Sequence, residues 1–448
     1  MIKLFKIVMV GFGLLTMFKL KAQEGVTLSL QEAQNYAIKN NYQAQKAALD
    51  VEIAKKKVFE TTAIGLPQVN AEGSIQRFLD IPVNLAPANS FNPLAPEDEL
   101  IALQFGLNYN NSYGISASQL IFDGSYIVGL QAAKAYKEVS ENSLIKTEIE
   151  LKESVKQAYF TVLVAQENEI VLTKSLASTK TMLKETEALY KAGLVEEQNV
   201  EQLSLTVNEL KTSVGIAEGQ VRFAKKLLLL QVGMNIDTTI TLTDNIDFFV
   251  EGVTIDVMEK EFKLENHIDY ALSQNNARLM QLNLRKEKYS FMPSLSAFFN
   301  HQQQNMSNDF DVFTDGRWFP STVIGAKLTL PILTSGMRLA KMSQAKIEWD
   351  KSKVDLKMTE QNLRYQSQLA KSNYETAYET YNNNKSNLDL AEKIYNKTVK
   401  KYQEGLVSSM ELAQAQNQFL STEGKYIQSL LDVLKSQSEL QKSFGNNQ

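Results

Sequence analysis

The amino-acid sequence predicts a mainly helical protein with a smaller β part, built as a tandem duplication. All eight prolines lie in two short stretches, 67–96 and 293–331, so the two long stretches between and after them are free to form helices. Leu and Ala recur at helical spacing in both long stretches. Residues of the first half also recur in the second half at a shift of 212 positions.

Composition excludes several classes of function. The 448 residues include 47 Lys and Arg and 51 Asp and Glu, and the net charge of −4 offers no basic surface for nucleic acid. The absence of Cys and the presence of only His267 and His301 argue against disulfides and thiolate or His-rich metal sites. No Walker A or HExxH pattern occurs. We therefore expect no enzyme activity, no cofactor and no bound metal.

The first 22 residues have the layout of a secretory signal peptide. Lys3 and Lys6 precede an apolar run over 7–18, and the small residue Ala22 follows. The alternative is a short membrane anchor, but the run is shorter than the roughly 18 residues that a spanning helix needs. No internal stretch reaches that length either. The sequence therefore predicts an exported protein whose first structural repeat begins at residue 23.

The long stretches about 125–231 and 337–440 are predicted to be coiled-coil-like helices. Apolar residues form a narrow seam with seven-residue spacing in each stretch: Leu144, Leu151, Ala158 and Ala165 in the first, and Leu356, Leu363, Ala370 and Ala377 in the second. A helix of about 65 residues would be about 100 Å long. Each repeat opens with a shorter helix, for which Ser29 with Glu32 forms a capping box and Asn266 is the candidate N-cap.

The proline-bearing stretches are predicted to be β-hairpins, at about 67–122 and 293–332. Apolar and polar residues alternate over 103–117 and 322–332, and the weaker strands run over 67–79 and 293–303. The expected hairpin tips are 80–100, which is long and rich in Pro and Asn, and 305–318. Four strands are too few to close a barrel with a lumen. They form either a soluble sheet or, pooled between chains, one membrane barrel, and the alternation fits both.

The duplication assigns the domain boundaries. At the shift of 212, Gly124 falls on Gly336, and Tyr190 falls on Tyr402. Gly193-Leu194-Val195 likewise falls on Gly405-Leu406-Val407. We therefore expect a first repeat over 23–232, a linker over 233–265 and a second repeat over 266–448.

These features together resemble the outer membrane efflux protein family, the TolC-like channels. The resemblance rests on the order of elements, the duplication, the paired Tyr-x-x-Gly-Leu-Val turns, the opening segment 28–33 and the strand-to-helix corners 120–124 and 330–336. It implies a homotrimer in which four strands per chain form a twelve-stranded outer-membrane β-barrel. The long helices would form a periplasmic α-barrel tunnel.

The same resemblance implies the function and its partners. The chain would be the outer-membrane exit duct of a tripartite efflux or type I secretion system, passively conducting small molecules or secreted protein. Its partners would be a periplasmic adaptor protein, an inner-membrane transporter and outer-membrane lipid. The alternative is a soluble exported coiled-coil spacer, adaptor or filament protein, which explains the helices and the export but not the hairpins.

The candidate functional residues lie in the turns 190–199 and 402–411. On residues alone these are helix-to-helix turns with a Gly cap. By resemblance they are also the periplasmic tip that docks the adaptor, through Gly193, Leu194, Val195, Gly405, Leu406 and Val407. Tyr402 takes the place of the family's gate tyrosine, while Asn199 replaces a gate aspartate. Glu411 and Gln414 take the two constriction-ring positions, of which only Glu411 keeps the charge; its alternative reading is a solvated helix-face acid.

Overall fold

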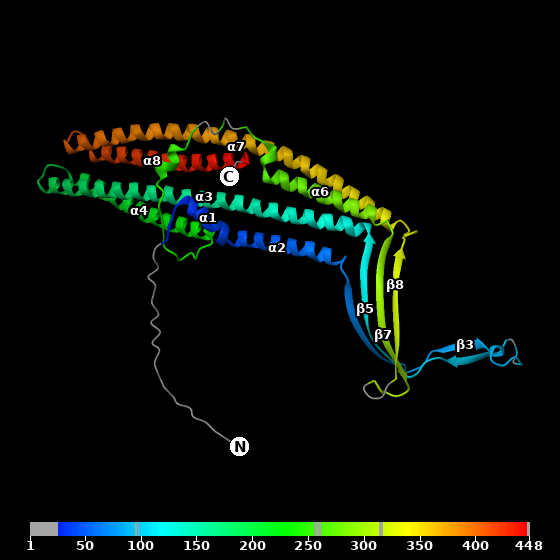
Figure 1. Ribbon diagram of the computed structural model, residues 1–448. Helices are drawn as coiled ribbons and strands as arrows, with labels where there is room; N and C mark the ends of the chain where they lie inside the picture. Colours follow the sequence, from blue (N-terminus) through cyan, green and yellow to red (C-terminus); the bar gives the residue numbers. More distant parts are fainter. Residues whose placement is uncertain are drawn as a thin grey trace, which may run out of the picture. The chain divides into compact units, whose positions relative to one another are not determined.

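The computed structural model describes residues 26–94, 96, 98–254, 258, 261–312 and 317–445. The predicted signal peptide lies outside these residues. The chain divides into two compact units, each made of three segments. We call them the tip unit (up to residue 44, 150–259 and 371–440) and the strand unit (45–149, 260–370 and 441–448). The two longest helices, α3 (Gly124–Lys191) and α7 (Met337–Gln403), contribute to both units (Figure 1).

The strand unit contains one four-stranded antiparallel sheet in the order β2-β5-β7-β8. Its strands are β2 (Gln68–Arg77), β5 (Tyr109–Asp123), β7 (Ser294–Ser307) and β8 (Trp318–Thr329). The two predicted hairpins therefore join into a single sheet through β5 and β7 (Figure 1). Strands β2 and β8 are its edges, and neither pairs with a second strand in the part of the chain that the structure describes.

The prediction for the first hairpin was partly wrong. The expected tip contains a second small sheet, in which β3 (Val83–Pro87) pairs with β4 (Leu100–Gln104). The strand expected over 103–117 is two strands, because Gly106 adopts a φ of 135° that ends the extended run. The alternation of side chains continues through this break, so periodicity alone could not detect it. We call the segment 83–104 the arm.

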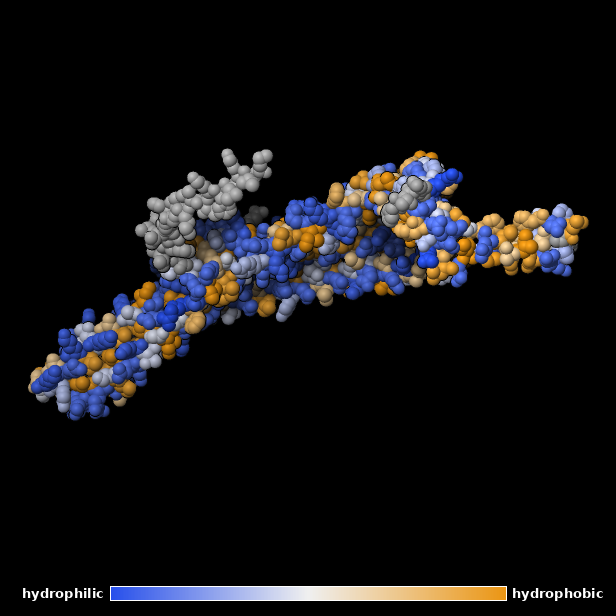
Figure 2. All heavy atoms as spheres, turned by 90° about the horizontal axis from the view of Figure 1, so that it is seen from below, coloured by the Kyte–Doolittle hydropathy of each residue, from blue (hydrophilic) through white to orange (hydrophobic). Residues whose placement is uncertain are grey.

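The arm exposes apolar side chains. Leu85 and Leu100 are 66% and 57% exposed, and Val83 is also exposed. Figure 2 shows hydrophobic residues gathered along this segment at the right end of the view.

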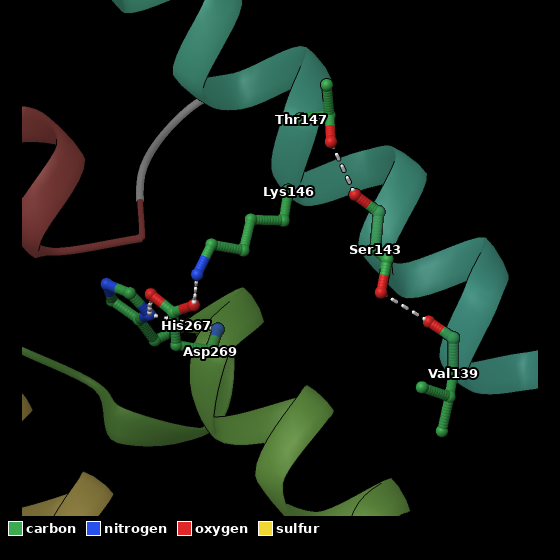
Figure 3. A network of polar contacts seen from close by, with 6 residues as sticks. All are labelled: Val139, Ser143, Lys146, Thr147, His267 and Asp269. Carbon is green, nitrogen blue, oxygen red and sulfur yellow. Dashed lines mark hydrogen bonds and ion pairs between the residues drawn. The ribbon is translucent and has the colours of Figure 1, made fainter. Parts of the chain in front are cut away.

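The shorter helices begin at polar N-caps. The capping box at α1 (Leu30–Asn40) is confirmed, since the Glu32 N–H donates to Ser29 Oγ and the Ser29 N–H donates to Glu32 Oε2. The cap predicted for α6 (Ile268–Tyr289) was wrong by one residue, because Asn266 ends a short 3-10 turn and His267 is the N-cap. The His267 Nδ1 accepts the Asp269 N–H at 3.2 Å (Figure 3). The corresponding helix α2 spans Tyr42–Ala63.

The tip unit contains the C-terminal parts of α3 (150–191) and α7 (371–403). It also contains α4 (Glu197–Val232) and most of α8 (Ser409–Ser443). Several residues of the predicted seams are buried, including Leu151, Ala158 and Ala370. Beside the helices, β1 (Val26–Leu28) pairs in parallel with β6 (Ile240–Leu242), and α5 spans Ile246–Glu251. Among the described residues, no helix has both the length and the apolar character required to cross a bilayer.

Candidate functional site at the helix turns

The two turns of the tip unit have the same backbone conformation. Gly193 and Gly405 adopt left-handed φ angles of 74° and 72°. The Gly193 N–H donates to Tyr190 O at 2.8 Å, and the Gly405 N–H donates to Tyr402 O at 2.9 Å. The next residue of each turn, Leu194 or Leu406, donates its N–H to a carbonyl five residues earlier. This is the pattern of a helix that ends on a left-handed glycine, and it turns the following leucine outward.

Each turn presents one large apolar side chain to solvent. Leu194 is 71% exposed and Leu406 is 68% exposed. A Cβ added at either glycine would meet nothing within 4 Å, so the surface around both turns is open. Val195 and Val407 are half-buried. Exposed leucines at matched positions on two turns are the kind of surface that a protein partner covers.

A small core of buried side chains lies behind the turns. It consists of one residue from each of the four helices: Met182, Leu203, Tyr395 and Leu412. The aromatic ring of Tyr402 packs against this core, as does Phe419, which stacks on Tyr395 with ring centroids 5.4 Å apart. The core therefore holds the two turns against each other.

Tyr402 and Asn199 each form a neutral hydrogen bond between the two repeats. The Tyr402 hydroxyl lies 2.8 Å from Thr186 Oγ1, which joins α7 to α3. The Ser409 Oγ donates to Asn199 Oδ1 at 2.6 Å, which joins α8 to the first turn of α4. The structure thus places both predicted gate residues in links between repeats, with separate partners. Thr186 and Ser409 carried no sequence signal, because a hydroxyl on a helix has no pattern that reveals its partner.

A third link lies deeper in the same bundle. Gln416 is fully buried, and its Nε2 donates to Ser175 Oγ at 3.0 Å and to Thr179 Oγ1 at 2.7 Å. This link joins α8 to α3. Sequence analysis missed it, because Gln416 falls among several glutamines and only packing shows which one is buried.

The two predicted constriction residues lie on the first turns of α8. Glu411 and Gln414 are both exposed, and the Glu411 N–H donates to Ser408 Oγ at 3.2 Å. Further along α8, Glu423 is half-buried, and its Oε2 has no hydrogen-bond partner among the residues that the structure describes. Burial, with the nearby Glu167 and Glu392, raises the pKa of Glu423 to about 7. Among the described residues, no group of three or more His, Cys, Asp or Glu is arranged to hold a metal ion.

Comparisons with known proteins agree with this arrangement. A family model described as outer membrane efflux protein matches residues 34–222 and 264–446. The outer membrane protein TolC of Vibrio cholerae serotype O1 is 23% identical over 332 residues, which cover 73% of this chain and 70% of TolC.

Solved structures show the same fold. The CmeC outer membrane channel of Campylobacter jejuni superposes with a TM-score of 0.71 at 19% identity, covering 93% of this chain and 86% of CmeC. The outer membrane protein VceC of Vibrio cholerae gives a TM-score of 0.69 at 15% identity, covering 93% of this chain and 96% of VceC. CmeC is a channel of the outer membrane and VceC is a protein of the outer membrane, which is the class that the family resemblance implied.

The chain belongs to the outer membrane efflux protein family. It is an outer-membrane exit duct for efflux with a TolC-like fold and a periplasmic extension. The expectation of this family from the sequence is confirmed, and the reading as an exported coiled-coil spacer is set aside.

Proposed function

We propose that three copies of the chain pool their sheets into one closed twelve-stranded barrel in the outer membrane. The observation that carries this is the sheet itself, whose edges β2 and β8 have no second neighbour among the strands that the structure describes. Pairing β8 of one copy with β2 of the next removes every free edge. The exposed apolar face of the sheet then meets lipid, for which strands of ten or more residues are long enough.

The turns of the tip unit dock a periplasmic adaptor protein, which connects the duct to an inner-membrane transporter. Leu194 and Leu406, with the glycines and valines beside them, form the contact surface. The bonds Tyr402–Thr186 and Ser409–Asn199 hold the turns in one arrangement. Neutral links of this kind are each worth about 1 kcal/mol. A partner that binds the turns can therefore rearrange them at modest cost, which is the property that a gate requires.

The same proposal assigns the narrow end of the tunnel to Glu411. Three copies of Glu411 around the axis concentrate negative potential where ions pass, and Gln414 adds polar but uncharged groups. The duct itself is passive, and the transporter supplies the drive and chooses the cargo, which is drugs, metal ions or secreted protein.

Native mass spectrometry of the detergent-extracted protein tests the barrel. Outer membranes are solubilised and the intact mass is measured. A mass of three mature chains supports the pooled barrel. A single-chain mass, or release of the protein without detergent, rejects it.

The docking surface is tested by Leu406→Glu, which places a charge on the turn without changing the glycine conformation. Drug export in cells, measured as the inhibitory concentration of an exported compound, is expected to fall to the level of a deletion strain while the trimer mass persists. Gly215→Glu is the control, because Gly215 is exposed on α4 with open space around it and is not in a turn. Normal export by the Leu406 variant rejects the assignment of the docking surface.

A further inference from the structure

The four strands of the sheet place one acid and one base on the same face. Residues directly opposite each other in an antiparallel sheet lie on one face. Glu72 on β2 is opposite Gly114 on β5, which is opposite Gln302 on β7, which is opposite Ser321 on β8. Counting along β8 in steps of two, Lys327 lies on this same face, opposite Ser296. The two charges are six residues apart along the sheet, or about 20 Å.

The remaining residues of this face are mostly small or polar. They include Asn70, Ser74, Ser112, Ser116, Asn300 and Gln304. Within β2, β5 up to Leu120, β7 and β8, Glu72 is the one acid and Lys327 the one base of the face. Past the irregularity between Leu120 and Phe122, Asp123 is opposite Ser294 and therefore also lies on this face, where its Oδ1 accepts the Tyr126 N–H and the Ser125 hydroxyl at the start of α3.

The other face of the sheet is apolar and exposed. Its exposed residues include Val69, Ile75, Ile115, Ile324 and Leu328. Ile324 is 82% exposed, which an apolar side chain tolerates when lipid covers it. In a closed barrel this face points outward, so the face that carries Glu72 and Lys327 lines the lumen.

Glu72 lies at the edge of a hollow in the polar face. The hollow has a volume of about 360 Å³ and is lined by Ser74, Ser112, Gly114, Ser116, Asn300 and Gln302, among others. Gly114 is one of the lining residues, and a Cβ there would come 2.5 Å from His301 O, so β5 and β7 approach each other closely at this point. Glu72 and Lys327 are both exposed. Neither makes an ion pair or a side-chain hydrogen bond to the residues that the structure describes, so both charges face the open side of the sheet.

We propose that Glu72 and Lys327 set the ion preference of the barrel lumen, as two charged levels of opposite sign. The inference rests on the proposed trimer, in which each level holds three copies of its residue. Three carboxylates at the Glu72 level attract cations and repel anions, and three ammonium groups at the Lys327 level do the reverse. Within one chain the two charges are about 20 Å apart along the strands, which is more than the Debye length of about 8 Å at 0.15 M salt, so each acts on ions separately. The strand part of the pore therefore has its own selectivity, apart from any ring at Glu411.

Single-channel recording in planar bilayers tests the proposal. The cation-to-anion permeability ratio is measured from the reversal potential in a KCl gradient. Glu72→Gln keeps the shape of the side chain and removes three charges from the trimer. One unit charge about 6 Å from an ion in bulk water is worth about threefold, so the ratio is expected to fall at least about threefold. Lys327→Gln is expected to raise the ratio by a similar factor. The opposite signs are the signature of two separate levels.

Asp98→Asn is the matched control, because it removes the same charge outside the proposed lumen. Asp98 is an exposed acid between the two strands of the arm. Its permeability ratio is expected to equal that of the wild type. Unchanged ratios in both lumen variants, or shifts of the same sign, overturn the proposal. If only Glu411→Gln shifts the permeability ratio, the proposal is also overturned, because the ion selectivity then arises at the helix turns.

The trimer mass separates this proposal from the proposed function. Variants that keep the mass of three chains and conduct, but show unchanged selectivity, reject the two charged levels and leave the exit duct standing. A single-chain mass for the wild type rejects both.

Discussion

The two repeats share a backbone junction and differ in the polar group at its centre. Gly233 follows α4 and Gly445 follows α8, and both adopt left-handed φ angles, 81° and 72°. A Cβ on Gly233 would lie 2.7 Å from Asn40 O, and one on Gly445 would lie 2.8 Å from Asn266 O. Each glycine thus packs against the residue that precedes an N-cap.

The N-caps at these two junctions are Asn41 and His267. The Asn41 Oδ1 accepts the Gln43 N–H at 2.7 Å, and the His267 Nδ1 accepts the Asp269 N–H at 3.2 Å. Both residues are 7% exposed. The two repeats therefore share the close backbone contact, which requires glycine, while the acceptor is an amide in one and a titratable ring in the other. Close contacts constrain a sequence more strongly than the chemistry of a cap does.

The largest expected effect is the difference in stability loss between an alanine substitution at a junction glycine and one at a turn glycine. Gly233→Ala forces an unfavourable φ and a clash with backbone, and we expect it to cost about 3 kcal/mol. Gly193→Ala imposes a similar φ in open space, so about 1 kcal/mol is expected. Thermal unfolding midpoints of the detergent-purified variants measure both. Equal shifts would show that the contact with Asn40 does not constrain the junction.

The second effect contrasts Glu423 with Lys211, which occupies the corresponding position of the first repeat and is exposed. The pKa of Glu423 in the folded protein, about 7, is above its ordinary value, so the folded state favours the protonated form. The stability that protonation supplies is lost as pH rises from about 4.5 through 7.

Glu423→Gln is therefore expected to stabilise the protein at pH 8 by about 1–2 kcal/mol, allowing for solvent screening of a half-buried group. At pH 4 the same change is expected to have little effect. Urea midpoints at the two pH values measure it, with Lys211→Gln as the control. A gain at pH 4 as large as that at pH 8 would rule out deprotonation of Glu423 as the cause.

The third effect concerns the cap that differs between the repeats. Burial lowers the pKa of His267, as do Lys442 and Lys146, while Asp269 acts in the opposite direction. Lys146 also pairs with Asp269 at 2.7 Å (Figure 3). Because the folded pKa is below the ordinary value, the stabilising contribution is present above pH 6.5 and is lost as pH falls through the folded pKa.

Between pH 7.5 and 5, the wild type is expected to lose about 1 kcal/mol, the usual worth of an N-cap. His267→Asn copies the first repeat and is expected to remove this loss, which pH-dependent unfolding midpoints measure. His301→Asn is the control, since His301 is the only other histidine of the sequence and lies in β7, half-buried and away from α6. The same acid loss in wild type and His267→Asn would mean that other groups cause it.

The smallest effect tests the two links at the turns. Tyr402→Phe removes the bond to Thr186, and Ser409→Ala removes the bond to Asn199. Each is expected to lower stability by about 0.5–1 kcal/mol, the usual net worth of a neutral hydrogen bond. Of the two partners left behind, Thr186 is buried and Asn199 is half-buried. Thermal midpoints give the size of each loss. If only one variant is destabilised, only one of the two hydrogen bonds stabilises the turns.

The helices, the two glycine turns and the duplication could all be predicted from local sequence patterns. Proline and glycine act through local backbone geometry, and a heptad seam reports the buried face of a helix, so these features need no knowledge of distant residues. The same reasoning found the sheet, since period-two alternation continues along β5 and β8.

The hydrogen-bond partners of the polar side chains could be read only from the tertiary structure. The bonds Tyr402–Thr186 and Gln416–Thr179 join residues more than 200 positions apart, and no local pattern specifies such a partner. The cap of α6 is His267 and not Asn266, which ends a 3-10 turn and whose carbonyl lies against Gly445 after the end of α8. Local conformation is encoded in neighbouring residues, whereas the partner of a side chain depends on how the folded elements pack.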